Sequence, residues 1–549
     1  MSGDFSQEPP IPMEAVQPGR NKRNAPFLLL KGKSRYLWAP LGIEALFLGI
    51  LLLGAPGGSR AAADTDVPLD VSGQPTWARY AAEQARRVLM MPDRARRMPD
   101  RTVEPAPPVI PEFETFRNQD GLSANFQPNG DTMTALQAFF APLGTNARTC
   151  QTCHQPAAGW TITPPQIQRA FQETGGTAPL FNPVDGAVCP DADVSTYEKR
   201  LQAYRLVLQK GLIRVFIKLP DAPTLQFSII SVQDPYGCNT GSTFGLSSFG
   251  PSAPTQGTVS VYRRPLPSTN LPFSTSLMWD GREPSLQSQA IDAALIHSQA
   301  GAPPTAAQLD QIVAFETGLF SAQDSSAKVG PLTESGAQGG PRALSEQPFY
   351  VGINDPLGGN PRGAPFNPDA MTLYSALESQ GPTASEDQLA VARGERLFNE
   401  KPITTTGVAG LNDKPGLATV KGFCTTCHDT PNVGNHSVPL PINIGVVAPS
   451  AAGLDTTGLP VFTLRCNAGP LAGQVFQVTD PGKALVSGQC ADIGKTKGPV
   501  LRNLAARPPY FHNGAAPDLR HVVDFYNTRF GIGFTDKEKS DLIAFLKSL

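Results

Sequence analysis

The sequence predicts a mainly α-helical protein made of two tandem domains of one kind, with small β-rich insertions. Three observations lead to this fold class. The pattern Cys-x-x-Cys-His occurs twice, at residues 150–154 and 424–428. A short internal repeat aligns Asn270-Leu271 with Asn503-Leu504 at an offset of 233 residues. Apolar residues recur at helical spacing in both halves of the 549-residue chain.

The repeated motif is the attachment signature of a c-type haem. Its two thiols bind the haem vinyl groups as thioethers, and the adjacent His ligates the iron. The alternatives for such a pattern are a redox dithiol or half of a zinc site. Because the motifs lie 274 residues apart and each carries its His, we favour two cytochrome c-like haem domains. The residues expected to hold two covalently bound c-type haems are Cys150, Cys153 and His154 for the first, and Cys424, Cys427 and His428 for the second.

Composition and the N-terminus narrow the class of protein further. The chain is 40% hydrophobic and 17% charged, so it can bury a substantial core, and its net charge of −2 argues against a nucleic-acid partner. Basic residues precede an apolar run at residues 45–56, and Ala61-Ala62-Ala63 follows. Residues 1–63 are therefore predicted to be a signal peptide for export to the periplasm. The alternative is an uncleaved anchor, which alone would bring the protein to a membrane.

Four cysteines remain outside the motifs. One pair, Cys189 and Cys238, follows the first motif, and Cys466 and Cys490 follow the second. Export permits disulfides, so we predict Cys189–Cys238 and Cys466–Cys490 among the three connectivities that four cysteines allow. Four buried free thiols are the alternative.

The first half of the chain begins with an Arg/Pro-rich lead-in at residues 64–115. Residues 116–322 form the predicted N-terminal haem domain, with a β-rich insertion at about residues 212–262 and an amphipathic helix at 306–320. A Gly/Ser/Pro-rich stretch at 321–341 predicts a linker, placed at residues 323–385 with the inter-domain segment.

Residues 386–549 form the predicted C-terminal haem domain. Helices are expected at residues 386–398, 519–528 and 535–549, and β-like pieces at 461–464 and 475–478. Thr535 with Glu538 is a capping box. Gly394 and Phe398, one turn apart, suit the close helix crossing of a cytochrome c domain.

Further motifs resemble those of the bacterial di-haem cytochrome c peroxidase/MauG superfamily. They are Met278-Trp279-Asp280-Gly281-Arg282 with Gln289 ten residues after the Trp, and Leu501-Arg502-Asn503 followed by Pro509-Tyr510-Phe511-His512-Asn513-Gly514. The resemblance implies that one haem activates peroxide, the other handles electrons, and Trp279 lies between them. A large aromatic filling a domain interface is the alternative for Trp279.

The resemblance also bears on the distal ligand of the second haem. The peroxidase branch has a Met twelve residues after its His-Asp-Gly, where this chain has Tyr526, and no Met follows Met371. Tyr526 matches the MauG branch, whose Tyr occupies that site, and a phenolate stabilises higher iron oxidation states. The alternatives are a core role for Tyr526, or ligation by one of three histidines: His436, His512 and His521.

The first haem departs from the peroxidase pattern. No His lies between His154 and His297, so the distal His cap of that branch is missing and the iron is expected to be open. The position of the family's acid/base Glu is Gln299, and its nearest protonatable neighbour is His297. We therefore expect His297, with Gln289, to act at this haem, against the alternative of a structural His. The family's calcium-binding Asn aligns with Arg264, so the sequence does not decide whether the protein binds calcium.

These observations predict a periplasmic di-haem oxidoreductase. It would react with hydrogen peroxide at the first haem and pass oxidising equivalents through the second. The electron donor would be a small redox protein, another protein or an organic molecule. Two alternatives stay open: a dioxygenase-like enzyme that uses dioxygen on an organic substrate, and a non-enzymatic electron carrier whose two haems are both saturated.

Overall fold

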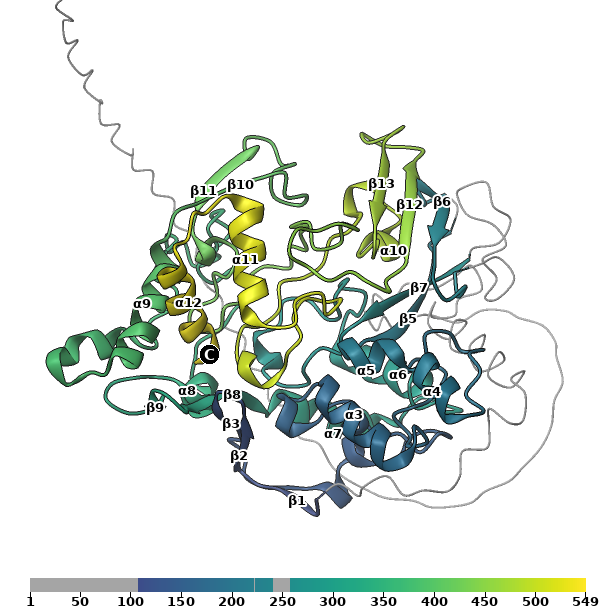
Figure 1. Ribbon diagram of the computed structural model, residues 1–549, viewed down its shortest axis with the longest axis horizontal. Coiled ribbons are helices and arrows are strands. Elements are labelled where there is room, and N and C mark those ends of the chain that lie inside the picture. Colours follow the sequence, from purple (N-terminus) through teal and green to yellow (C-terminus); the bar gives the residue numbers. More distant parts are fainter. Residues whose placement is uncertain (1–106, 222, 240–256) are drawn as a thin grey trace, which may run out of the picture. The chain divides into compact units, whose positions relative to one another are not determined.

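Helices and small antiparallel sheets alternate along the chain (Figure 1). The computed structural model describes residues 107–549 except residue 222 and residues 240–256. The helices are α3 (Pro164–Thr174), α4 (Tyr197–Ala203), α5 (Arg205–Lys210), α6 (Leu286–Ile296), α7 (Ala306–Thr317), α8 (Gly340–Ser345), α9 (Glu386–Glu400), α10 (Ala484–Ser487), α11 (Leu519–Phe530) and α12 (Asp536–Lys547). The strands are β1 (Val109–Ile110), β2 (Phe113–Asn118), β3 (Gly121–Phe126), β4 (Thr132–Met133), β5 (Ile213–Lys218), β6 (Phe227–Gln233), β7 (Thr258–Arg263), β8 (Phe320–Ser326), β9 (Gly330–Pro331), β10 (Ile403–Thr406), β11 (Thr419–Gly422), β12 (Val461–Cys466) and β13 (Val475–Val478).

The predicted long helices of both halves form where expected. They are α7, α9, α11 and α12, and each begins where a side chain caps the first turn. Thr535 and Glu538 make the predicted capping box at the start of α12. Capping satisfies amide groups that the first helical turn leaves without partners, which explains why these boundaries can be located in the sequence.

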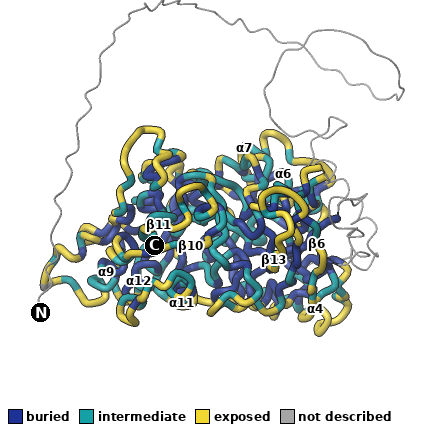
Figure 2. Tube along the Cα trace, turned by 90° about the horizontal axis from the view of Figure 1, so that it is seen from above, coloured by how far each residue is buried: buried dark blue, intermediate teal, exposed yellow. Residues whose placement is uncertain are grey.

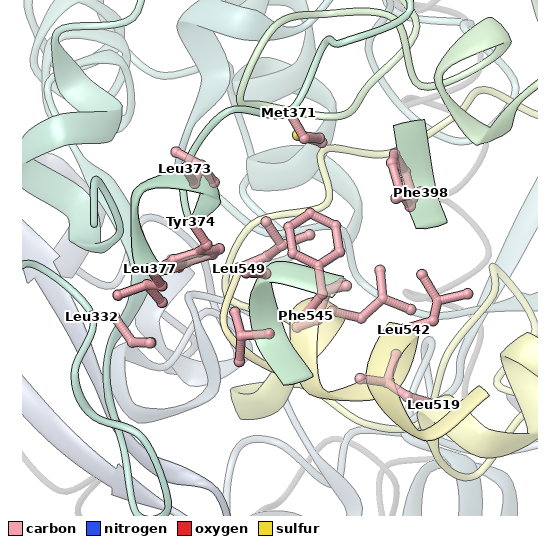
Figure 3. Close-up of a cluster of buried hydrophobic side chains, with 14 of the residues drawn as sticks. Leu332, Met371, Leu373, Tyr374, Leu377, Phe398, Leu519, Leu542, Phe545 and Leu549 are labelled. Atoms are coloured by element: carbon pink, nitrogen blue, oxygen red, sulfur yellow. The ribbon is translucent and has the colours of Figure 1, made fainter. Parts of the chain in front are cut away.

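The close crossing expected at Gly394 is present between α9 and α12. A Cβ atom at Gly394 would lie 2.1 Å from the carbonyl oxygen of Asp541 and 2.7 Å from the Cβ of Phe545. Figure 3 shows the buried apolar cluster between these helices, with Phe398 from α9 and Leu542 and Phe545 from α12. The absence of a side chain at residue 394 therefore lets the two helix backbones approach.

The two β-rich insertions pair with each other. Strand β6 of the first insertion and strand β12 of the second are antiparallel neighbours in the sheet β13-β12-β6 (Figure 1). Ile229 pairs with Leu464, and Phe227 pairs with Cys466. These side chains are buried in one core cluster, so segments more than 200 residues apart fold as one unit. The sequence predicted both pieces as β-like but not their pairing.

The prediction of a mainly α fold understates the strand content of the described residues. Strands β2, β3, β8 and β9 form a four-stranded sheet. Strand β2 begins within the predicted lead-in, and β8 runs through the start of the predicted linker. Ser321, Ala322 and Gln323 of β8 are fully buried. Small and polar residues suggested a loop, but their backbone groups are paired with β3, and tertiary pairing overrides local propensity.

The internal repeat of the sequence recurs in the backbone. Asn270 and Asn503 both have positive φ, 60° and 57°, at the start of a 3₁₀ turn. At the same offset, Met278 and Phe511 have φ of 61° and 66°. The isolated bridge between Leu277 and Glu283 likewise corresponds to the one between Tyr510 and Ala516. The two segments therefore share one local structure, followed by α6 in one half and α11 in the other.

Only one of the two predicted disulfides is formed. Cys466 and Cys490 are bonded, joining β12 to the 3₁₀ turn at residues 490–492. Cys189 and Cys238 are free and buried, which corrects the prediction for this pair. Their thiols meet as hydrogen-bonding partners, and this contact raises the pKa of Cys189 and lowers that of Cys238. Chain topology thus brings the pair together without a covalent bond.

A thiol count checks this difference. In the unfolded holoprotein, whose four haem cysteines are blocked as thioethers, two thiols per chain are expected to react with Ellman's reagent, from Cys189 and Cys238. The Cys189→Ser/Cys238→Ser double variant should give none, because Cys466 and Cys490 are bonded. No reactive thiol in the unmodified chain would restore the predicted second disulfide.

Figure 2 shows how buried segments run through the described residues, with exposed segments at loops and helix surfaces. The predicted signal peptide and most of the lead-in lie outside the described residues. Within residues 107–549, gaps excepted, no helix has the length and apolarity needed to cross a membrane.

Candidate functional site

The first Cys-x-x-Cys-His motif opens into a cavity with about 1410 Å³ of empty volume, part of it open to solvent. Cys150, Cys153 and His154 line it. Gln289 and His297, which follow the first copy of the sequence repeat, line it as well. The motif itself is a 3₁₀ turn in which the amide of His154 donates to the carbonyl oxygen of Cys150 at 3.0 Å, so the local backbone aims all three side chains into one space.

The second motif opens into its own cavity, with about 1880 Å³ of empty volume. Cys424, Cys427 and His428 line it. The turn has the same form, with the amide of His428 donating to the carbonyl oxygen of Cys424 at 3.0 Å.

Each motif histidine is held in the tautomer that an iron ligand needs. Nδ1 of His154 donates to the carbonyl oxygen of Trp160 at 3.0 Å, and Nδ1 of His428 donates to that of Gly434 at 2.7 Å. Burial lowers the pKa of His154 to about 4 and lowers that of His428, so both imidazoles are neutral. The unprotonated Nε2 is then the free ligand atom.

The motif thiols do not fit the two alternative interpretations. Burial raises the pKa of Cys153 to about 11 and that of Cys424 and Cys427 to about 12, whereas a redox dithiol needs a lowered pKa. Neither pair forms a disulfide. Among the described residues, no group of three or more His, Cys, Asp or Glu side chains is arranged to hold a metal ion, as a zinc site would require. The donor sets and cavities fit covalently attached haem.

His297 forms a hydrogen bond with the carboxylate of a buried ion pair, Asp185 and Arg148. Its Nδ1 lies 2.5 Å from Oδ2 of Asp185, and Oδ1 of the same carboxylate lies 2.6 Å from a guanidinium nitrogen of Arg148. Burial would raise the pKa of Asp185, but Arg148 and His297 outweigh it and lower that pKa to about 2. The ionised carboxylate fixes Nδ1 as a protonated nitrogen, so Nε2 is the ring nitrogen that can exchange a proton.

The two glutamines near this cavity differ in position. Gln289 lies on α6 and lines the first cavity. Gln299, which aligns with the family's Glu, turns away: its side-chain oxygen accepts from Asn146 at 3.2 Å and from Asn182 at 3.4 Å. The structure thus places His297 in the cavity lining, whereas Gln299 is not part of that lining.

Met278 and Trp279 stand at the border of the two cavities. Met278 lines the first cavity and Trp279 the second. Trp279 is 9% exposed, and its indole N–H donates to the carbonyl oxygen of Arg264 at 2.8 Å. The two cavities also share part of their lining, namely Pro265, Pro267, Lys497, Pro499 and Arg507. Trp279 thus lies in the wall of the second cavity, next to a residue of the first.

Tyr526 lies on α11 and lines the second cavity. Burial is the main cause that raises the pKa of its hydroxyl, followed by the nearby Cys427 and Cys424. Of the competing histidines, His436 and His512 also line this cavity, and Asp429 holds Nδ1 of His436 at 2.9 Å. His521 is exposed on the first turn of α11 and does not line it. The structure therefore brings Tyr526 close to the motif cysteines.

Several site residues carry no signal in the sequence. Asp185 and Arg148 bind behind His297, and Ser268 places its hydroxyl 3.0 Å from Nδ1 of His154. Glu316 is a buried carboxyl in the wall of the first cavity, and burial raises its pKa to about 7. These residues come from four separate segments, so only the folded chain shows that they meet.

Arg264 occupies the position that the resemblance assigns to a calcium ligand. It lines the second cavity, and its guanidinium donates to the carbonyl oxygens of Lys210 and Arg507, both at 3.3 Å. A guanidinium cannot coordinate a cation, because it has no acceptor atom.

Comparisons with known proteins give partial matches. No family model matches the chain. It is 34% identical to the cytochrome-c peroxidase IdrP2 of Denitromonas iodatirespirans over 144 residues, which are 24% of this chain and 37% of the relative. It is 31% identical to the cytochrome c551 peroxidase of Nitrosomonas europaea over 99 residues, 16% of this chain and 30% of the relative. The matched segments thus span about a third of the length of these curated relatives.

A solved structure is also similar over part of the chain. It is a MauG-like protein associated with microbial copper homeostasis, with 17% identity and a TM-score of 0.28, covering 53% of this chain and 74% of that one.

Proposed function

We propose that this chain, which belongs to the bacterial di-haem cytochrome c peroxidase/MauG superfamily, is a periplasmic oxidoreductase that reduces hydrogen peroxide with two c-type haems. One observation carries the proposal: each Cys-x-x-Cys-His motif opens into its own cavity, and the two cavities share a wall. The repeated backbone of the two halves supports two related haem domains, one for each cavity.

A haem bound at His154 would supply the iron at which the O–O bond of peroxide is reduced. Around it, the chain provides an acid/base group and a polar neighbour. Nε2 of His297 accepts the first proton of the incoming peroxide and returns it to the leaving oxygen, while Asp185 holds Nδ1 in place. The amide of Gln289, which lines the same cavity, orients the bound peroxide by hydrogen bonding.

Trp279 links the two sites in this proposal. Its ring lines the second cavity, while the preceding residue Met278 lines the first. The ring packs edge-on against His512, with centroids 6.1 Å apart. Oxidising equivalents would cross this wall to the second site, where a small redox protein or an organic molecule supplies electrons.

The experiment that tests the proposed function starts from haem content. Purified holoprotein is expected to contain two covalent haems per chain by the pyridine haemochrome assay. When the protein is mixed with hydrogen peroxide in a stopped-flow spectrometer, the absorption spectrum of the first haem should change as the peroxide reacts. Two purely six-coordinate low-spin ferric haems that do not react with peroxide would instead indicate an electron carrier. Reaction only with dioxygen and an organic substrate would indicate a dioxygenase.

Tyr526 is proposed as the distal ligand of the second haem. The Tyr526→Phe variant removes the hydroxyl and is expected to change the optical and electron paramagnetic resonance spectra of the second haem alone. Tyr510→Phe is the matched control, because Tyr510 lines the same cavity but donates its hydroxyl to the carbonyl oxygen of Leu504 at 2.9 Å. Identical spectra for Tyr526→Phe and the unmodified protein would refute the assignment.

A further inference from the structure

Four cationic side chains in the cavity walls have no acidic partner among the described residues: Arg264, Lys497, Arg502 and Arg507. Their hydrogen bonds go to backbone carbonyl oxygens, such as that of Ser276 for Lys497 at 2.7 Å and that of Asn432 for Arg502 at 2.7 Å. The Nε atoms of Arg502 and Arg507 are buried without any partner.

Two other buried arginines are paired with carboxylates. Arg148 binds Asp185, and Arg263 binds both Asp280 and Asp480. Burial lowers the pKa of Arg264 to about 9, of Lys497 to about 8 and of Arg507 to about 10, and no carboxylate offsets it. Burying a cation without a counter-charge is unfavourable, so these four side chains favour an anionic partner.

The four cations are distributed over both cavities. Arg502 lines the first, Arg264 lines the second, and Lys497 and Arg507 line both. The lining of the second cavity contains no Asp or Glu. The first has two, of which Asp185 is already paired with Arg148, and burial raises the pKa of the other, Glu316, to about 7. The walls therefore present positive charge toward the space that the cofactors would fill.

We propose that Arg264, Lys497, Arg502 and Arg507 bind the propionate carboxylates of the two haems, with Lys497 and Arg507 shared between the two cofactors. The inference rests on the two haems of the proposed function. Each haem carries two propionates, so four carboxylates meet four cations. Charge-assisted hydrogen bonds to carboxylates are the ones that satisfy unpaired guanidinium donors best. The shared cations would then couple the charge states of the haems across the wall.

The proposal predicts which haem responds to each substitution. Removing a cation beside a haem favours the oxidised, more positive state and lowers the reduction potential. Lys497→Met is expected to lower the potentials of both haems, whereas Arg264→Met should lower that of the second haem alone. A tenfold change in the one-electron equilibrium, about 59 mV, is the expected size.

Spectroelectrochemical titration of each haem in the purified holoprotein tests this, with resonance Raman bands of the propionates as a second readout. Lys497→Arg keeps the charge and should keep both potentials. Arg529→Met is the matched control, since Arg529 also binds only carbonyl oxygens but lines neither cavity. Titrations run with and without phosphate separate propionate from a free anion.

The outcomes are distinct. Lowered reduction potentials with shifted propionate bands support the proposal. If one of the two Met variants cannot be purified with both haems, the other is sufficient for the test. Unchanged potentials and bands, or shifts that need phosphate, overturn it and leave the two-haem function intact. Absence of two covalent haems in the unmodified protein would already have refuted the proposed function.

Discussion

Replacing His297 by Gln is expected to slow the reaction of hydrogen peroxide with the first haem by a factor of about 10² to 10⁴. The amide of Gln is similar in size but cannot accept and return a proton. Nε2 of His297 is available for this role because Asp185 binds Nδ1 at 2.5 Å. The carboxylate of Asp185 stays ionised at neutral pH, since its pKa is lowered to about 2. Stopped-flow rates at several peroxide concentrations measure the effect.

A matched control separates proton transfer from a general effect on the protein. His521 also pairs through Nδ1 with an aspartate, Asp518 at 2.7 Å, but it is exposed and lines neither cavity. His521→Gln should leave the rate unchanged. An unaltered rate in His297→Gln would assign that residue to structure, and the spectrum of the second haem should be the same in both variants.

Substitution of Gly394 by Ala is expected to destabilise the protein, by about 1–3 kcal/mol, the usual cost of forcing extra atoms into a packed core. In an open helix the same change would stabilise by up to about 1 kcal/mol, because Ala is the better helix former. Here the new Cβ would lie 2.1 Å from a backbone oxygen of α12, which no side-chain rotation can relieve. A lower apparent melting temperature by circular dichroism measures the loss.

Gly301→Ala is the control for this experiment. A Cβ at Gly301 meets no atom within 4 Å, so its melting temperature should be unchanged. The separation of α9 from α12 should also disturb the second haem, since Phe398 of α9 lines that cavity and packs 5.8 Å from the ring of His428. Equal melting temperatures for the two variants would mean that α9 and α12 can accommodate a methyl group at residue 394.

Local patterns accounted for much of the fold. Helices α7, α9, α11 and α12 follow from apolar periodicity and capping residues, which act over one or two turns. Sheet pairing did not follow in the same way. Strand β8 has the composition of a loop, and its burial depends on β3, about 200 residues earlier. Pairing between distant segments is set by the whole chain, and no nearby residue encodes it.

The disulfide prediction illustrates the same limit. Position after each motif suggested two bonded pairs, and only Cys466–Cys490 is bonded. Order along the chain places cysteines in the same region, but a bond also needs the two sulfurs at specific distance and orientation. Cys189 and Cys238 meet as thiols without that bond.

By itself, the sequence predicted the chemistry of attachment: the six motif residues and the repeat indicate two similar haem sites, and the absence of any Met after Met371 excludes a Met ligand from the second domain. Tertiary structure alone decided what surrounds those sites. It placed Asp185 behind His297, Met278 and Trp279 at the border of the cavities, and four unpaired cations in their walls. The physical reason is range: covalent attachment needs neighbouring residues, whereas electrostatics and proton transfer act through space between segments that only folding brings together.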